Sequence, residues 1–319
     1  MSLPAPSVDL IQPFQIASGA FRGRLVRLTA SLDEILAGHD YPEPVARLLA
    51  EALALAAALA GSLKYDGLFT LQIKGDGPVS LLVADITSGG DLRGYAKFDE
   101  TRLAEIQALG AQSSGRSPVP ALLGAGYLAF TVDQGPDTDR YQGIVELEGA
   151  TLTDCVHEYF HRSEQLATVV RSAVGHDDSG WQAASLMLQR MPSHGGVGSS
   201  AGVGPEGDAS AEDAEEEWRR AVILLSSATD KESLDRTLGG DRLLYRLFHA
   251  DHLRLSEAKI LRAQCRCSES KVAGALRSFP REEVEELKDE SGRVIVTCEF
   301  CKSDYSFGSA DLDRLFTVE

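Results

Sequence analysis

The sequence predicts an α+β protein with a mixed α/β core domain, a helical linker region and a small C-terminal unit that contains four cysteines. Three observations lead to this prediction. Strand-like and helix-like segments alternate over about the first 190 residues, which is typical of a mixed core. A glycine- and serine-rich stretch without apolar periodicity follows. The four cysteines stand in two pairs near the end. We place the core domain at 1–192, the linker region at 193–258 and the C-terminal unit at 259–319.

The core domain begins with strands followed by two helices. Residues from about 12 to 30 predict strands, and Phe21 to Leu28 alternates between apolar and polar side chains, as a half-buried strand does. Ser31-Leu32-Asp33-Glu34 fits a capping box at the start of a short helix. Pro42 and Pro44 precede an alanine- and leucine-rich stretch, Val45 to Leu63, which predicts a long, closely packed helix.

The rest of the core combines strands with two further helices. Leu68 to Lys74 alternates as a strand, Gly75 to Pro78 forms a turn, and Val79 to Ile86 is an apolar return strand. Gly75-Asp76-Gly77 is therefore interpreted as a hairpin turn rather than as a phosphate-binding loop. We predict further strands at 92–98, 126–133 and 143–147, and helices at Thr153 to Leu166 and Gly180 to Gln189.

The linker region starts with a segment that predicts a flexible connection. Ser193 to Ala211 is rich in glycine, serine and alanine and has no apolar period, so it cannot bury enough surface to become ordered. Within it, Gly196 to Ala201 matches the letters of a dinucleotide fingerprint. No strand precedes these residues and no convincing helix follows them, as that mechanism requires, so we interpret them as linker. The chain also lacks the G-x-x-x-x-G-K-[ST] pattern of an ATP-binding P-loop.

An apolar helix face follows the acidic run Glu212 to Glu217. Its side chains recur at i, i+3, i+4 and i+7, as on one side of an amphipathic helix. A second apolar cluster comes about twenty residues later. Both clusters can pack against the core or bind a partner, and the two interpretations are compatible if a switch exposes them. The face comprises Trp218, Ala221, Val222 and Leu225, and the second cluster comprises Leu243, Leu244, Leu247 and Phe248.

Composition excludes some classes of function. The chain has 319 residues, 43% of them hydrophobic, and a formal net charge of −17, which disfavours binding to the phosphate backbone of nucleic acids. The first residues, Met1 to Pro6, show no basic segment before an apolar stretch, so we expect no secretory signal. The most apolar run, Ala52 to Leu63, is too short to span a bilayer. We therefore expect a cytoplasmic protein that binds no membrane.

The two cysteine pairs have the spacing of metal ligands. Cys265 and Cys267 are separated by one residue, and Cys298 and Cys301 by two, with positions 268 to 297 between the pairs. Four thiolates brought together in this way suit a tetrahedral Zn²⁺ ion. Metal-ligand spacing in four of five cysteines also indicates a reducing compartment. The tighter first pair leaves two neighbouring thiols that can oxidise. A purely structural zinc site and unrelated buried thiols are the alternatives.

One other metal motif and one other cysteine occur in the core. His157-Glu158-Tyr159-Phe160-His161 spells the H-E-x-x-H helix of zinc metalloproteases, in which Glu158 would be the general base. Because no third ligand follows in a protease-like context, we interpret the match as a surface coincidence. Cys155, which has no partner in the sequence, is interpreted as a small buried apolar residue, with a peripheral thiol as the alternative.

The pattern of the cysteines and of their flanks resembles the redox-regulated holdase chaperones of the 33 kDa heat-shock protein family. That family ends in C-x-C, about thirty residues, and C-x-x-C, as here. The glycine-rich segment departs from it, because less glycine is expected there. Segments elsewhere are also similar to the family, namely Lys74 to Pro78, Leu92 to Tyr95, Tyr127 to Pro136, Tyr141 to Leu147, Leu243 to His249 and Val272 to Ser278.

The resemblance implies an ATP-independent stress-response chaperone that binds unfolded proteins and prevents their aggregation. It implies one Zn²⁺ per reduced, inactive chain, held by the four cysteines. Oxidation would form Cys265–Cys267 and Cys298–Cys301 disulfides, release zinc from this redox-switch domain and produce a homodimer. The candidate client-binding and switch surface is Trp218, Val222, Leu225, Leu244 and Phe248.

Two other functions remain open at this point. One is a zinc-dependent peptidase that uses His157, Glu158 and His161. The other is a zinc-ribbon adaptor that binds a fixed protein partner without redox switching. The first predicts hydrolytic activity that depends on Glu158, and the second predicts partner binding that peroxide does not change.

Overall fold

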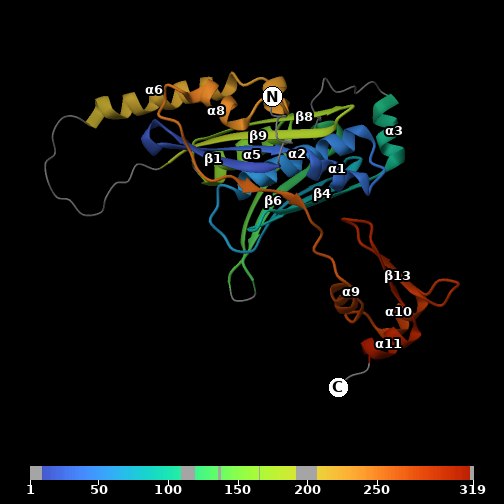
Figure 1. Ribbon diagram of the computed structural model, residues 1–319. Coiled ribbons are helices and arrows are strands. Elements are labelled where there is room, and N and C mark those ends of the chain that lie inside the picture. The colour runs from blue at the N-terminus through green and yellow to red at the C-terminus, as the bar shows by residue number, and fades with distance from the viewer. Residues whose placement is uncertain (1–8, 109–118, 136–137, 165, 192–206, 317–319) are drawn as a thin grey trace, which may run out of the picture.

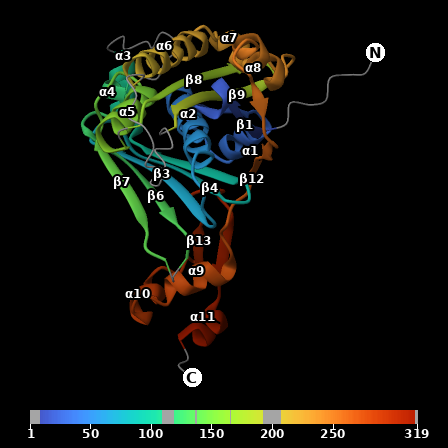
Figure 2. The same ribbon diagram turned by 90° about the vertical axis from the view of Figure 1, so that its left-hand side faces the viewer.

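The protein has an α+β fold, as the sequence predicts (Figure 1). The computed structural model describes residues 9–108, 119–135, 138–164, 166–191 and 207–316. Within these residues, two six-stranded sheets form the core and a two-stranded hairpin belongs to the C-terminal unit. Figures 1 and 2 show this unit projecting from one side of the core. The divisions at 192 and 258 stay predictions.

The first core sheet, here called sheet A, is antiparallel. Its strands lie in the order β10-β1-β2-β9-β8, and β11 also pairs with β1. The sheet thus joins both ends of the core domain and the last part of the linker region. The strands are β1 (Leu10–Ile16), β2 (Phe21–Leu28), β8 (Thr168–Asp177), β9 (Gly180–Arg190), β10 (Arg254–Leu255) and β11 (Lys259–Ile260).

The second core sheet, sheet B, has the order β12-β5-β4-β3-β6-β7. The short edge strand β12 pairs in parallel with β5, and the other pairs are antiparallel. The hairpin between β3 and β4 confirms the predicted turn at Gly75 to Pro78. The strands are β3 (Leu68–Gly75), β4 (Val79–Thr87), β5 (Asp91–Phe98), β6 (Gly126–Asp133), β7 (Tyr141–Glu146) and β12 (Arg262–Ala263).

A buried helix, α2 (Glu43–Ala60), lies between the two sheets and confirms the predicted long helix. It packs against β2, β8 and β9 of sheet A and against β3, β4 and β5 of sheet B. Alanine along its length allows this close approach on every side. The other core helices are α1 (Ala30–Ala37), α3 (Glu100–Ala108), α4 (Val119–Leu122) and α5 (Leu152–Tyr159), with a 3₁₀ turn at Ala17–Gly19 and a π-helical turn at Phe160–Glu164.

The predicted capping box at the start of α1 is wrong. Ser31 lies inside the helix and is buried, and the N-cap residue, Thr29, accepts no side-chain capping bond. The carboxylate of Asp9 instead accepts the Thr29 N–H at 2.7 Å and the Ser31 N–H at 2.6 Å. A carboxylate from twenty residues earlier therefore satisfies the free N–H groups of the first turn.

The predicted helix at Gly180 to Gln189 is also wrong, because this segment is strand β9. Ala183 to Gln189 are all buried, since α2 covers one face of the strand and the linker helices cover the other. A strand buried on both faces shows no polar alternation, and its alanine, leucine and methionine content imitates a helix.

The linker helices cover the outer face of sheet A. They are α6 (Gly207–Ser226), α7 (Asp230–Leu234) and α8 (Gly240–Phe248). Even-numbered residues of β1 and β9 and odd-numbered residues of β2 point toward them, and the opposite parity points toward α2. Phe14 stacks on Phe248 with ring centroids 5.6 Å apart, and Phe21 contacts Trp218 at 5.3 Å. The covered face consists of Phe14, Ile16, Phe21, Leu25, Leu186 and Leu188.

The start of α6 corrects the predicted glycine-rich linker. The helix begins at Gly207, so the expectation of a flexible connection through Ala211 is wrong for 207–211. Alanine and aspartate among these residues favour a helix start. Residues 193 to 206, including the dinucleotide-like letters at 196–201, lie outside the described residues.

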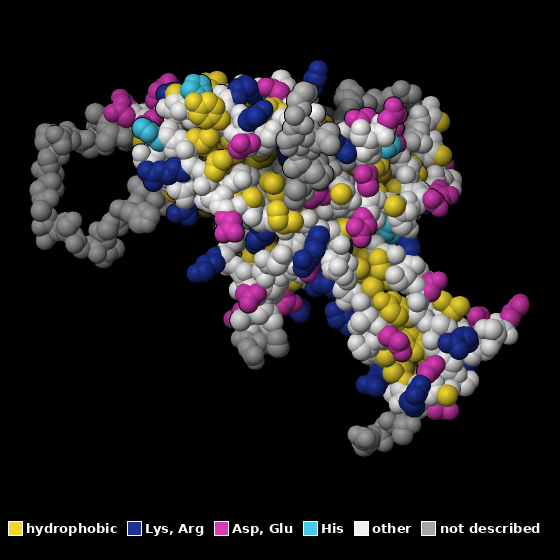
Figure 3. Space-filling model, in the orientation of Figure 1, with side chains coloured by type: hydrophobic (Ala, Val, Ile, Leu, Met, Phe, Trp, Pro, Cys, Tyr) yellow, Lys and Arg dark blue, Asp and Glu magenta, His cyan; other side chains and the backbone are white. Residues whose placement is uncertain are grey.

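The C-terminal unit has a small apolar core of its own. It contains α9 (Glu269–Leu276), α10 (Arg281–Glu286), the hairpin of β13 (Val294–Thr297) and β14 (Asp304–Phe307), and α11 (Ser309–Phe316). Figure 3 shows apolar side chains gathered along the exposed surface of this unit. A core of this size provides little stability by itself. The buried apolar side chains are Leu276, Val284, Val294, Phe307 and Leu312.

Candidate metal centre

The four paired cysteines converge on one point. The Sγ atoms of Cys265, Cys267, Cys298 and Cys301 all lie within 4.8 Å of one another. The Cys265–Cys298 distance is 3.8 Å and the Cys267–Cys301 distance is 3.4 Å. Tetrahedral zinc with bonds of about 2.3 Å separates its sulfur ligands by about 3.8 Å. The donor set and its spacing therefore fit a metal ion, and the residues that the structure describes contain no second group of this kind.

Each cysteine pair is held by a local turn. Cys265 and Cys267 lie between β12 and α9, and Ser268 caps α9 by accepting the Lys271 N–H at 3.3 Å. Cys298 and Cys301 occupy the turn of the β13–β14 hairpin. The Cys298 N–H donates to Ser303 O at 2.9 Å, and Lys302 has the left-handed φ of 55° that closes the turn. The hairpin thus positions the C-x-x-C pair independently of the first pair.

Burial and hydrogen bonds shift the pKa values of three of the four thiols. Burial raises the pKa of Cys267 to about 12 and also raises the pKa of Cys298. Burial acts in the same direction on Cys301, but hydrogen bonds with Ser303 and the neighbouring thiols outweigh it and lower that pKa to about 6. A metal ion at this point would need all four cysteines as thiolates, because metal binding requires deprotonated ligands.

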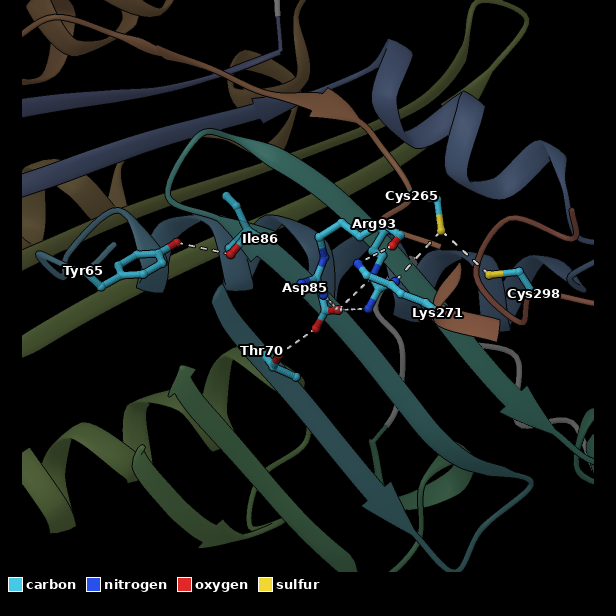
Figure 4. Close-up of polar contacts among 9 residues, drawn as sticks. Tyr65, Thr70, Asp85, Ile86, Arg93, Cys265, Lys271 and Cys298 are labelled. Carbon is cyan, nitrogen blue, oxygen red and sulfur yellow. Dashed lines mark hydrogen bonds and ion pairs between the residues drawn. The ribbon is translucent and has the colours of Figure 1, made fainter. Parts of the chain in front are cut away.

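A hydrogen bond and a cation from outside the cysteine turns also reach the cluster. The Tyr305 hydroxyl donates to Cys267 Sγ at 3.0 Å, and this bond raises the pKa of Tyr305 to about 12. From β5 of the core, Arg93 Nη1 lies 4.0 Å from Cys265 Sγ (Figure 4). The sequence analysis missed both residues. For Arg93 the sequence offered one signal: this arginine and Asp85 are charged residues within the strands predicted at 92–98 and 79–86.

The predicted switch surface lies away from the cysteines. Leu225, Leu244 and Phe248 are fully buried against sheet A, and Trp218 is half-buried there. Val222 is half-buried but lies outside this apolar cluster, in which Leu224 packs instead. The cysteine cluster lies beside the outer face of sheet B. The structure therefore does not bring these two sets of residues together. The segment 254–263, with strands β10, β11 and β12, connects them along the edges of both sheets.

The H-E-x-x-H letters do not form a metal site in the described structure. The Nε2 atom of His157 accepts the Val170 N–H at 2.7 Å, and Glu158 forms an ion pair with Arg162. His161 is exposed on the π-helical turn that follows. His157 is half-buried and bonded to a strand of sheet A, so the prediction is wrong only in placing this residue at the surface. Its role in the described structure is to join α5 to β8.

This role of His157 predicts a specific pH dependence. Burial lowers its pKa below the usual value for histidine, so the folded protein binds this proton only at lower pH than the unfolded chain does. Stability therefore falls as the pH drops below about 6.5. We expect His157→Gln to keep the parent zinc content and to lose less stability than the parent between about pH 7.5 and 5.5. Urea unfolding and elemental analysis measure these quantities, and loss of zinc from the variant would support the peptidase interpretation.

Cys155 agrees with its predicted role as a buried apolar residue. Its side chain is fully buried in the core, and burial raises its thiol pKa to about 12. It is also distinct from the group of four cysteines. A neutral, buried thiol reacts slowly with oxidants. We therefore assign Cys155 no part in the metal centre.

The chain is similar to known proteins over nearly its whole length. Residues 9–308 match the Hsp33 protein family. A 33 kDa chaperonin of Caulobacter vibrioides (strain NA1000 / CB15N) is 41% identical over 301 residues, covering 93% of this chain and 94% of that protein. A 33 kDa chaperonin of Pseudomonas fluorescens (strain SBW25) is 36% identical over 314 residues, covering 98% and 94%.

The fold has a counterpart among solved structures. The crystal structure of a 33 kDa chaperonin from Thermotoga maritima matches with a TM-score of 0.78 and 22% sequence identity. The match covers 96% of this chain and 97% of that one. In the described part of the chain, every helix is too short or too polar to cross a membrane.

Proposed function

Because the chain belongs to the Hsp33 family of chaperones, we propose that it is a redox-regulated, ATP-independent holdase. It would bind unfolding proteins under oxidative stress and prevent their aggregation. Family membership confirms the resemblance seen in the cysteine motifs. The observation that carries the proposal is the position of the four-cysteine cluster, in a unit whose own buried core is five apolar side chains.

In the reduced state, the four cysteines would hold one Zn²⁺ ion. The ion would supply the attraction that keeps the four thiolates together and would so link α9 to the β13–β14 hairpin. Structural zinc in small units provides about 10–16 kcal/mol of apparent binding free energy. This is large beside the stability of a whole domain, about 5–15 kcal/mol. The folding of the unit would therefore depend on the state of Cys265, Cys267, Cys298 and Cys301.

Oxidation would remove these ligands. A thiolate attacks hydrogen peroxide to give a sulfenic acid and hydroxide, which is protonated to water, and a second thiol then forms a disulfide and releases another water. Each disulfide consumes one peroxide and two thiols. We propose the pairs Cys265–Cys267 and Cys298–Cys301, which the resemblance to the family implies. The released Zn²⁺ and the loss of its ligands would unfold the unit.

Unfolding of the unit would weaken the docking of the linker helices. The segment 254–263 pairs with β1 and β5 and leads directly into Cys265, so movement there reaches the edge of sheet A. Departure of α6 and α8 would expose the covered apolar face of sheet A, and the apolar residues of these helices as well. Contiguous apolar surface of this kind binds other unfolded chains. Trp218, Val222, Leu225, Leu244 and Phe248 are thus the proposed switch and client-binding surface.

The proposal extends to location and partners. The protein would act in the cytoplasm, bind unfolded or partly folded clients and form a homodimer when oxidised. Its net charge of −17 disfavours nucleic acid as a partner. No observed feature favours the peptidase. The adaptor without redox switching remains the competing function for the same cysteine cluster.

The decisive test follows zinc and client aggregation in parallel. Reduced protein is treated with hydrogen peroxide while a chelating dye reports released zinc, and light scattering reports aggregation of a denatured model protein diluted into the sample. We expect about one zinc per chain to be released and aggregation to be suppressed only afterwards. Addition of dithiothreitol with zinc should reverse both. Zinc release without any gain in protection would instead support the adaptor.

A further inference from the structure

Residues that lie between the paired cysteines contact the core. Arg266, between Cys265 and Cys267, places Nη2 2.7 Å from the Asp85 carboxylate of β4. Phe300, inside the second pair, lies with its ring centroid 3.8 Å from the Arg93 guanidinium carbon. The Phe300 carbonyl accepts a hydrogen bond from His39 Nε2 at 3.1 Å. Both cysteine turns therefore dock on the core through their intervening residues.

Asp85 is the centre of this interface (Figure 4). It lies on the outer face of sheet B, because its neighbours Ala84 and Ile86 point toward α2. Its side chain is nevertheless only 4% exposed. It accepts hydrogen bonds from Arg93 Nε and Nη2 at 2.8 and 2.6 Å, and from Thr70 Oγ1 at 2.7 Å. Arg266 adds the second guanidinium, so a buried carboxylate is shared between the core and the cysteine turn.

Strand β12 continues the same interface along the backbone. The Arg262 N–H donates to Gly90 O at 3.1 Å, and the Gln264 N–H donates to Leu92 O at 2.9 Å. Gln264 directly precedes the first cysteine. These two amides exchange with solvent only when β12 leaves β5, so they report on docking of the cysteine turn.

We propose that Asp85 is the core residue that holds the cysteine unit docked in the resting state. The docking is polar and acts on the outer face of sheet B, whereas the linker helices dock through apolar contacts on sheet A. Because Arg266 is flanked by two of the proposed ligands, rearrangement of Cys265 and Cys267 moves it away from Asp85. The role of this contact in switching rests on the proposed function, but the docking contact itself does not.

The test replaces the carboxylate with a neutral isostere. We expect Asp85→Asn to keep the parent zinc content and the exchange rates of α2, while the Arg262 and Gln264 amides exchange about 10- to 100-fold faster. This range corresponds to the loss of a hydrogen bond between charged groups. The matched control is Asp133→Asn, which removes a half-buried carboxylate on the same sheet, paired with Arg140. In this control the Arg262 and Gln264 amides should exchange at the parent rate.

A second variant separates docking from a general loss of stability. Arg266→Gln changes the cysteine turn and leaves the core sequence intact. If both residues act through one contact, the double variant should exchange no faster than the faster single variant. Parent-like exchange at both amides in Asp85→Asn, or fully additive effects, would overturn the proposal. Since exchange is measured on reduced protein without clients, failure of the chaperone test leaves this result unaffected.

Discussion

Replacing Cys298 with serine is expected to abolish zinc binding and to unfold the C-terminal unit while the core remains folded. A neutral serine hydroxyl is a poor zinc ligand beside a thiolate, and the structure provides no fifth cysteine near the cluster, within its described residues. The unit would then depend on its five buried apolar side chains. Loss of a contribution of about 10–16 kcal/mol exceeds what such a core can offset.

Two measurements and a control variant check this expectation. Elemental analysis should find no zinc in reduced Cys298→Ser protein. Amide exchange should become fast throughout α9, α10, β13, β14 and α11 but stay slow in α2. Cys155→Ala is the matched control, because it removes a thiol that lies buried in the core and should retain the parent zinc content. Full zinc in the serine variant would reject the proposed ligand set.

Shortening two buried side chains of the linker helices is expected to produce a chaperone that is active without oxidation. In a double variant, Leu225→Ala and Phe248→Ala each remove a fully buried side chain from the interface with sheet A. Such truncations destabilise packing by about 2–5 kcal/mol for leucine and about 3–5 kcal/mol for phenylalanine. Because both side chains lie between the linker helices and sheet A, their loss mainly weakens the docking of these helices on the sheet. Val222 is half-buried, so its replacement should have a smaller effect.

The readout is suppression of client aggregation by the reduced double variant beside the reduced parent. We expect protection from the variant and none from the parent, with equal zinc content because no cysteine has changed. Ile223→Ala is the control, since Ile223 lies on the same helix and is 63% exposed. Equal inactivity of reduced variant and parent, with an unchanged peroxide requirement, would remove this interface from the switching mechanism.

Several features of the fold could be read directly from the sequence. The alternation of Phe21 to Leu28 and of Leu68 to Lys74 predicted two strands, and the alanine-rich stretch predicted the buried helix α2. These signals are local, because side-chain direction within a single element has a fixed period. Strand β8 was missed because its buried residues do not alternate along the strand. The strands β10 to β12 were missed because two-residue strands carry no periodic signal.

The sequence by itself determined the cysteine pairs and the family, whereas only the tertiary structure decided how the parts are joined. Metal-ligand spacing is local, so Cys265, Cys267, Cys298 and Cys301 were predicted to converge, and they do. The conformation of β9 depended on layers packed against both of its faces. The contact between Asp85 and Arg266 joins residues 181 positions apart, and no local pattern specifies such a pair. Its burial, and with it the docking of the cysteine unit, arises only when sheet B and the C-x-C turn are folded together.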